Sequence, residues 1–206
     1  NILNGIQYDS IYHEHIFYFS LSSIINTLKI HKLTVVDILK SPISGGALIV
    51  YAKKHSKNIK IENSVNTLLN DEKKNKLNSL QTWKKFSKNV QNHKIKFNEN
   101  FVHLSKKYKN ICCYGASARS STFLNYVNLN YNHIRYIFDK SELKVNKYSP
   151  GSKIKIINLS QINKIKPDLI IILAWNFKEE IIKELRNKYS YKNDFFVSFP
   201  SLKILK

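Results

Sequence analysis

The sequence lacks methionine altogether and contains only two cysteines, five glycines and four prolines. Cys112 and Cys113 are adjacent, so their thiols can neither staple separate loops together nor form a spaced metal clamp. This use of cysteine fits a reducing cytoplasm. Long hydrophobic runs are missing as well. The best of them, residues 169–175, has the length of a strand, so we expect no membrane span.

Acidic residues are scarce too, with 14 Asp and Glu against 34 Lys and Arg and a net charge of +20. Such a charge invites a nucleic-acid partner. Only three of the basic residues are arginines, however, whereas arginine is the residue that binds phosphates and guanines through two hydrogen bonds. The lysines are scattered, and clusters such as residues 73–76 look like solvated helix faces. We therefore expect no nucleic-acid partner, although the charge can attract an anionic small molecule.

What is present is typical of a folded globular protein, with 43% hydrophobic and 12% aromatic residues. The first region, residues 1–55, is expected to hold a loop, a short helix near 21–28 and two strands near 33–39 and 47–51. This strand pair resembles the closing edge of a larger sheet.

The second region, residues 56–109, has the apolar spacing of helices and is expected to be a helical connector. Its longer helix carries a stripe of apolar side chains at steps of three, four or seven. We expect this stripe to pack on a neighbouring domain. It consists of Trp83, Phe86, Val90, Phe97, Phe101 and Leu104.

The third region, residues 110–206, alternates strand and helix patterns. We expect strands at 111–114, 134–138, 154–157, 169–173 and 195–199, and helices at 119–126, 160–165 and 177–188. This alternation predicts a small parallel sheet covered by helices, which is a Rossmann-like domain.

Residues 12–15 gather a tyrosine, two histidines and a glutamate into four consecutive positions. Histidine is suited to remove a proton near neutral pH, a carboxylate can orient the imidazole, and a tyrosine hydroxyl can donate to a developing enolate oxygen. Zinc is less favoured, because the histidines lie two rather than four positions apart. A surface turn with chance histidines is the alternative. Since almost no chain precedes this cluster, we expect the sequence to be the C-terminal part of a larger enzyme.

Residues 115–122 follow an expected strand and open an expected helix. A turn of small residues at that place exposes backbone N–H groups and predicts an anion site. The hydroxyls of Ser121 and Thr122 and the guanidinium of Arg119 are candidate donors to a pyrophosphate. The turn is no dinucleotide fingerprint, because G-x-G-x-x-G needs three glycines and only Gly115 is present. Helix N-capping by serine, without a ligand, is the alternative.

Three further positions lie where ligands of open α/β sheets bind. Asp139 closes the second strand, where a ribose-binding acid would stand. Residues 148–151 and 174–176 fall in loops, and the second of these follows a strand. Trp175 and Asn176 are suited to stack on a base or to hydrogen-bond a sugar, and covering of the sheet is an equally open alternative.

Taken in order, these blocks resemble the sugar C-methyltransferase family. Residues 9–20 (DSIYHEHIFYFS) look like the segment that contains the family's catalytic tyrosine, glutamate and histidine. Residues 113–126 (CYGASARSSTFLNY) resemble the opening of its C-terminal domain. Asp139, residues 148–151 and residues 175–177 continue the match in the family's order, so the resemblance covers nearly the whole chain.

The resemblance implies transfer of a methyl group from S-adenosylmethionine to a carbon of a nucleotide-linked keto-deoxysugar. It implies that His15 is the base that removes the proton beside the ketone, and that Tyr12 and Glu14 position His15 and the substrate or steady the enolate. The C-terminal domain of the family helps to hold the sugar nucleotide. The substrate-binding residues that we assign on this basis are Arg119, Ser121, Thr122, Asn125, Tyr148, Trp175 and Asn176.

The family's zinc cysteines and its acidic, glycine-containing S-adenosylmethionine loop have no counterpart in these residues. We therefore expect the S-adenosylmethionine site mostly, and zinc only, in an upstream region, and name no cofactor-binding or metal-binding residue here. The expected fold is α/β. Residues 1–55 would be the end of a methyltransferase core with the catalytic loop, 56–109 the connector and 110–206 the Rossmann-like domain. The alternative function is a non-catalytic module that binds a nucleotide or a sugar nucleotide.

Overall fold

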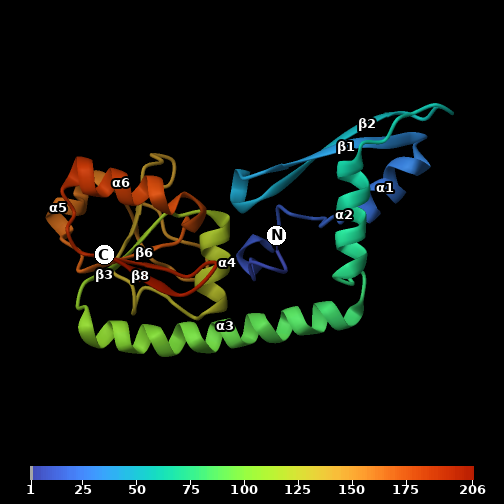
Figure 1. The fold of residues 1–206 in the computed structure, drawn as a ribbon. Helices are drawn as coiled ribbons and strands as arrows, with labels where there is room; N and C mark the ends of the chain where they lie inside the picture. Colours follow the sequence, from blue (N-terminus) through green and yellow to red (C-terminus); the bar gives the residue numbers. More distant parts are fainter. Residues whose placement is uncertain (1) are drawn as a thin grey trace. The chain divides into compact units, whose positions relative to one another are not determined.

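The computed structural model describes residues 2–206, which form two compact units (Figure 1). The first unit is His15–Asn89, and the second combines Ile2–Glu14 with Val90–Lys206. Helix α3, Leu80–Lys107, contributes residues to both. The N-terminal segment therefore belongs to the same unit as the C-terminal half of the chain. The expected division at residues 55 and 109 concerns family domains rather than packing and stays a prediction.

The first unit is built on an antiparallel pair of strands. Strand β1, Leu33–Ser41, pairs with β2, Ala47–Lys54, and the 3-10 turn η2, Ile43–Gly45, joins them. Both expected strands and their pairing are confirmed. Two strands alone are marginally stable in water, and here two helices pack on them. These are α1, Leu21–Ile30, and α2, Asn63–Lys74.

The core of the first unit lies between these helices and the strand pair. Its buried side chains are Leu21, Val35, Ile38 and Val65. Ser20 caps helix α1: its hydroxyl accepts a hydrogen bond from the backbone N–H of Ser23, as serine commonly does at a helix start. The carboxylate of Glu72 in α2 accepts hydrogen bonds from the N–H groups of Leu21 and Ser22, the first two residues of α1, and so links the two helices.

The second unit contains a six-stranded sheet in the order β5-β4-β3-β6-β7-β8. All neighbours are parallel except β7 and β8. The strands are β3 (Ile111–Tyr114), β4 (Ile137–Asp139), β5 (Ile156–Asn158), β6 (Leu169–Ile172), β7 (Asp194–Val197) and β8 (Lys203–Leu205). The chain runs from β3 outward to β5 and then returns to β6 on the other side of β3. The topological switch point of the sheet therefore lies between β3 and β6.

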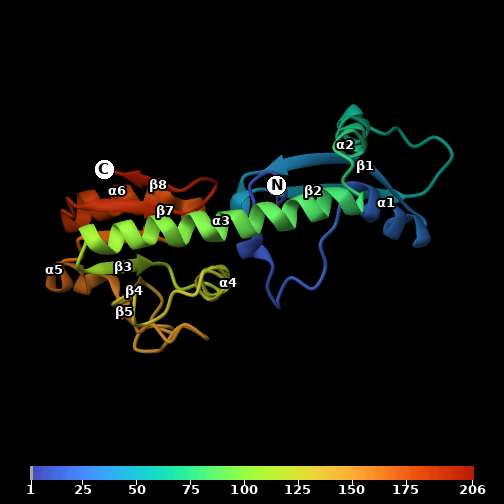
Figure 2. The ribbon, with the colours of Figure 1, turned by 90° about the horizontal axis from the view of Figure 1, so that it is seen from below.

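Helices cover both faces of this sheet (Figures 1 and 2). The helical elements of the unit are η1 (Tyr8–Ser10), α4 (Ala118–Tyr126), η3 (Leu159–Gln161), α5 (Ile162–Ile165), η4 (Trp175–Phe177) and α6 (Lys178–Tyr189), beside α3. On one face, Ile162 of α5 and Ile181 of α6 belong to one core cluster with strand residues such as Ile170. On the other face, the ring of Phe97 in α3 lies 4.9 Å from Phe123 of α4.

The expected Rossmann-like alternation is confirmed, and several details differ. Strand β4 is shorter than expected, because residues 134–136 stay outside it. The antiparallel edge strand β8 was not predicted, since its short segment reads as a charged tail. The apolar stripe of the connector is buried at five of its six residues, and only Trp83 of the stripe, at 41%, is exposed. Across the described helices, hydropathy nowhere reaches the level that a bilayer-spanning segment needs.

Candidate functional site

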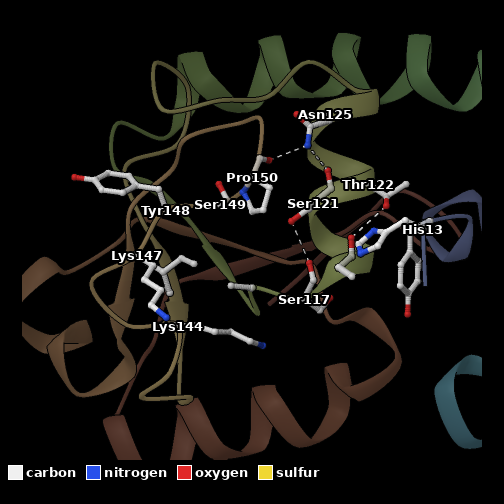
Figure 3. A pocket seen from close by; sticks show the side chains of 14 residues that line it. His13, Ser117, Ser121, Thr122, Asn125, Lys144, Lys147, Tyr148, Ser149 and Pro150 are labelled. Carbon is white, nitrogen blue, oxygen red and sulfur yellow. Dashed lines mark hydrogen bonds between the residues drawn. The ribbon is translucent and has the colours of Figure 1, made fainter. Parts of the chain in front are cut away.

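A cavity of about 410 Å³ opens in the second unit, beside the ends of β3 and β4 (Figure 3). Ligands of open α/β sheets lie at this carboxyl edge. Three pieces of chain form the walls: the start of the Tyr12–His15 cluster, the first turns of α4, and the loop after β4. The lining residues are Tyr12, His13, Ala116, Ser117, Ala118, Ser121, Thr122, Asn125, Lys144, Lys147, Tyr148, Ser149, Pro150 and Ile156.

The turn from β3 into α4 is held in one conformation by its own residues. Gly115 has a φ of +94°, and a side chain there would place its Cβ 2.9 Å from the Cβ of Ala174, so only glycine fits. Ser117 caps α4 by accepting a hydrogen bond of 3.1 Å from the backbone N–H of Ser120. The N–H of Ala116 donates to a carboxylate oxygen of Asp139 at 2.7 Å. Ser117 is therefore the serine N-cap that the alternative interpretation expected, and the turn also lines the cavity.

The loop after β4 is fastened to α4 through Asn125. Its amide donates to the carbonyl of Ser121 at 2.7 Å and to the carbonyl of Pro150 at 3.0 Å. Gly151, with a φ of +73°, lets the loop pass this amide, because a Cβ there would lie 2.1 Å from the Asn125 oxygen. The hydroxyl of Ser149 accepts from the N–H of Ile154 at 2.9 Å. These bonds fix the wall that carries Tyr148, a residue that is itself 62% exposed.

Positive charge lines one side of the cavity. Figure 3 shows Lys144 and Lys147 on the side opposite His13, with Ser117 and Ser121 between them. Lys144 lies 3.8 Å from the Asp139 carboxylate, while Lys147 forms no ion pair with any described residue. The hydroxyls of Ser121 and Thr122 donate to backbone carbonyls and so offer only oxygen lone pairs to the cavity, whereas the ammonium groups of the two lysines are its charged donors. An anion with several oxygen atoms suits this surface.

The Tyr12–His15 cluster is divided by the structure. Tyr12 and His13 line the cavity, whereas Glu14 and His15 do not. His15 is an exposed residue of the first unit, where its ring lies 6.2 Å from that of Tyr18. His13 was not among the assigned residues. Nothing in the sequence separated the two histidines, because both are polar residues of one loop.

The cavity therefore brings together five of the ten assigned residues. These are Tyr12, Ser121, Thr122, Asn125 and Tyr148. It does not include the other five, which are Glu14, His15, Arg119, Trp175 and Asn176. Its charge comes from Lys144 and Lys147, which were not among the assigned residues.

Arg119 and Trp175 bind a carboxylate of the chain itself. The guanidinium of Arg119 donates to Asp9 through Nε at 2.9 Å and through Nη2 at 3.0 Å. The indole N–H of Trp175 donates to the same carboxylate at 2.9 Å. Asp9 is only 2% exposed. Since Arg119 follows β3 and Trp175 follows β6, Asp9 occupies the switch point of the sheet.

These contacts bear on the cofactors that the unit can hold. A dinucleotide or S-adenosylmethionine in a Rossmann-type sheet uses the glycine-rich turn, the acid that ends the second strand and the switch point. Here the turn approaches Ala174 closely, Asp139 is bonded to Ala116, and Asp9 fills the switch point. The second unit therefore does not fit either cofactor in that position. Within residues 2–206, there is no group of three or more His, Cys, Asp or Glu side chains that could hold a metal ion.

The buried thiols take no part in this site. Burial raises the pKa of the Cys112 thiol to about 12, and burial raises the pKa of Cys113 well above its usual value. Both side chains are fully buried in strand β3 and carry no disulfide. They act as packing residues.

Comparison with known proteins gives two matches. The family model described as the C-methyltransferase C-terminal domain matches residues 42–200. The C-methyltransferase NovU of Streptomyces niveus is 28% identical over 204 residues, which cover 99% of this chain and 49% of that protein. The chain thus spans about half the length of the curated relative that it matches.

Proposed function

The chain belongs to the C-methyltransferase C-terminal domain family, and from this premise we propose that it forms part of a C-methyltransferase whose substrate is a nucleotide-linked keto-deoxysugar. The methyl donor that such a family suggests is S-adenosylmethionine. In this proposal the second unit holds the nucleotide part of the substrate, and the Tyr12–His15 cluster acts on the sugar. We place the enzyme in the cytoplasm, in keeping with two adjacent free thiols.

One observation carries the proposal: the cavity joins the start of the predicted catalytic cluster to a wall that carries two lysines. Tyr12 and His13 stand on one side of it, and Lys144 and Lys147 on another. A diphosphate needs several donors and positive charge, whereas a neutral sugar needs few charges. A substrate with both parts would place its diphosphate at the lysines and its sugar toward Tyr12.

The chemistry assigned to this chain ends at the enolate. His15 takes the proton from the carbon beside the ketone, and the electron pair of that C–H bond moves into the carbonyl group. The hydroxyl of Tyr12 donates to the oxygen that gains negative charge, and Glu14 orients the imidazole of His15. S-adenosylmethionine supplies an electrophilic methyl group when it is bound. We place its pocket outside the second unit and give the residues there no role in methyl transfer.

Binding of the diphosphate is tested by calorimetry on the chain with uridine diphosphate, thymidine diphosphate and inorganic pyrophosphate. Lys147→Ala removes one charge from the cavity and is expected to weaken binding of all three about tenfold. The matched control is Lys164→Ala, which removes an exposed lysine from α5 at the other edge of the sheet. Equal weakening by both variants would show that only the overall charge of the protein attracts the anions.

Proton removal is tested on the complete native protein in heavy water, without a methyl donor. A nucleotide-linked keto-deoxysugar should then take up deuterium at the carbon beside its ketone. His15→Gln is expected to slow this exchange by a factor of roughly 10²–10⁴ and to leave nucleotide binding unchanged. The control is His31→Gln, which alters another exposed histidine of the same unit. Exchange at the normal rate in His15→Gln would refute His15 as the base.

The non-catalytic binding module remains the second candidate, because the cavity lining includes neither Glu14 nor His15. It predicts nucleotide binding that depends on Lys147 together with no deuterium uptake by the native protein.

A further inference from the structure

The most deeply buried part of the N-terminal segment lies directly before the predicted catalytic cluster. Tyr8, Asp9 and Ser10 of η1 are 5%, 2% and 8% exposed, and Ile11 is already 45% exposed. The chain therefore leaves the protein interior within one residue of η1. Because the Tyr12–His15 loop begins directly after η1, the position of η1 limits where this loop can lie.

We propose that Asp9 is a positioning residue, which holds the Tyr12–His15 loop against the second unit by binding Arg119 and Trp175. This role rests on the proposed function of the loop. It assigns a task to an aspartate that no sequence pattern singled out, and it gives Arg119 and Trp175 a task other than direct substrate binding.

The geometry of the contact favours one arrangement of the loop. Arg119 binds the Asp9 carboxylate with two N–H groups, in the planar fork that a lysine cannot provide. The indole of Trp175 donates to one of the same oxygens, and the Arg119 guanidinium lies 5.0 Å from the centre of the indole rings. Each of the three side chains thus fixes the other two.

Burial explains why this contact serves position more than stability. The side chain of Asp9 is 2% exposed and that of Arg119 15%, so both charges have lost most of their water. The attraction of a buried pair is largely offset by this desolvation, and apolar residues in its place are often as stable. A directional, charged contact at the switch point is therefore suited to fix the position of η1 on the sheet, since its hydrogen bonds can form in only one placement of η1.

The distance along the chain supports the same conclusion. Tyr12 follows Asp9 by three residues, which span at most about 10 Å when extended. While Asp9 is fixed, Tyr12 and His13 stay within reach of the cavity wall that they line. Tyr8 adds a second contact through its hydroxyl and His93, but it lies farther from the loop.

The test compares Asp9→Asn with Asp168→Asn in the complete native protein. Asn keeps the shape of the side chain and removes its charge. Asp168 is a matched control, because it is a partly buried aspartate of the same unit that accepts two backbone N–H bonds at the opposite, amino edge of the sheet. Trp175→Phe, which removes one donor and keeps an aromatic ring, serves as a second variant should Asp9→Asn fail to fold.

Two measurements are made on each variant. Hydrogen exchange of the hydrogen-bonded backbone amides in and beside η1, within residues 7–11, should speed up about tenfold or more in Asp9→Asn and stay unchanged in Asp168→Asn. Deuterium uptake by the keto-sugar should slow roughly 10- to 100-fold in Asp9→Asn, as expected for a misplaced catalytic group. Binding of thymidine diphosphate should weaken about threefold at most, because Lys144 and Lys147 keep their places.

The outcomes separate this proposal from the function on which it rests. Normal amide exchange in residues 7–11 of Asp9→Asn, or an equal change in Asp168→Asn, overturns the positioning role. A native protein that takes up no deuterium refutes the proposed function. In that case faster amide exchange in Asp9→Asn still supports Asp9 as the anchor of the loop, and unchanged exchange overturns it.

Discussion

Replacement of His93 by phenylalanine should expose how the N-terminal segment is held to the second unit. The Nε2–H group of His93 donates to the carbonyl of Ser198 at 2.8 Å, because a carbonyl can only accept. Nδ1 therefore accepts from the Tyr8 hydroxyl, 3.1 Å away. The ring is also stacked on Phe199, with a centroid distance of 5.0 Å. Phenylalanine keeps the ring and its stacking and removes both hydrogen bonds.

The expected loss of stability follows from what is left behind. Tyr8 and Ser198 are 5% and 3% exposed, so neither the hydroxyl nor the carbonyl can turn to water. A buried polar group without its partner costs about 1–3 kcal/mol. His93→Phe should therefore lower the free energy of unfolding by about 2–6 kcal/mol. Tyr8→Phe alone leaves only Nδ1 without a partner and should cost about 1–3 kcal/mol.

The double variant provides the decisive comparison. With both side chains replaced by phenylalanine, the Tyr8 hydroxyl and Nδ1 are removed together, and only the Ser198 carbonyl remains unsatisfied. The loss should then be smaller than the sum of the two single losses by at least about 1 kcal/mol. Urea unfolding of the chain, followed by far-ultraviolet circular dichroism, measures all four proteins.

The same histidine makes stability depend on pH. Burial lowers the pKa of His93 below its ordinary value of 6.5, and this effect outweighs the opposing effects of the Ser198 carbonyl and of Asp9. Because the pKa is lower in the folded than in the unfolded state, the neutral ring supports folding above pH 6.5, and this support is lost as the pH falls from 6.5 toward the folded pKa. The native chain should lose stability over that range, and the loss should be smaller in His93→Phe. Additive single losses together with equal pH profiles would refute this account of His93.

Three other changes test the remaining parts of the structure. Gly115→Ala should destabilise the chain by about 1–3 kcal/mol in thermal unfolding, because residue 115 has a positive φ and the new Cβ overlaps Ala174. Adding Ala174→Gly to this variant should recover only part of the loss, since the positive φ remains. An unchanged melting temperature of Gly115→Ala would contradict the geometry. Glu72→Ala removes the carboxylate that accepts the first N–H groups of α1 and should cost about 1–2 kcal/mol in urea unfolding, with faster amide exchange in α1; unaltered exchange there would argue against the contact. Cys112 and Cys113 should react with iodoacetamide only after the chain unfolds, since burial raises the pKa of both thiols. Mass spectrometry can follow the labelling, and rapid labelling of the folded chain at pH 8 would contradict their burial.

The secondary structure was largely predictable because each segment carries its own pattern. The run Leu169–Ile172 is apolar throughout and becomes a central strand, and Ala118–Tyr126 begins with a serine cap and becomes a helix. Strand β8 was missed, because Lys203–Leu205 is short and half-exposed and gains its strand character only by pairing with β7. Pairing at a sheet edge depends on the partner, which lies outside the segment itself.

The candidate site was predictable where one segment supplies several residues. Ser121, Thr122 and Asn125 follow each other on one helix, so their common location could be read along the chain. Lys144 and Lys147 were not recognised, since they are two of many lysines and only the path of the loop after β4 brings them to the cavity. Arg119 was recognised as a ligand-binding side chain, but its contact with Asp9 joins residues that are 110 positions apart.

The sequence by itself determined the order of the helices and strands apart from β8, the α/β class and the family, because local spacing and short ordered motifs carry that information. The tertiary structure decided which polar side chains face a common cavity and which bind each other. Asp9, Arg119 and Trp175 are all polar or aromatic residues beside strand ends, and as single residues they look alike as ligand-binding candidates. Folding brings them within hydrogen-bond distance in a buried place, where a charge must have a partner, and so they bind one another.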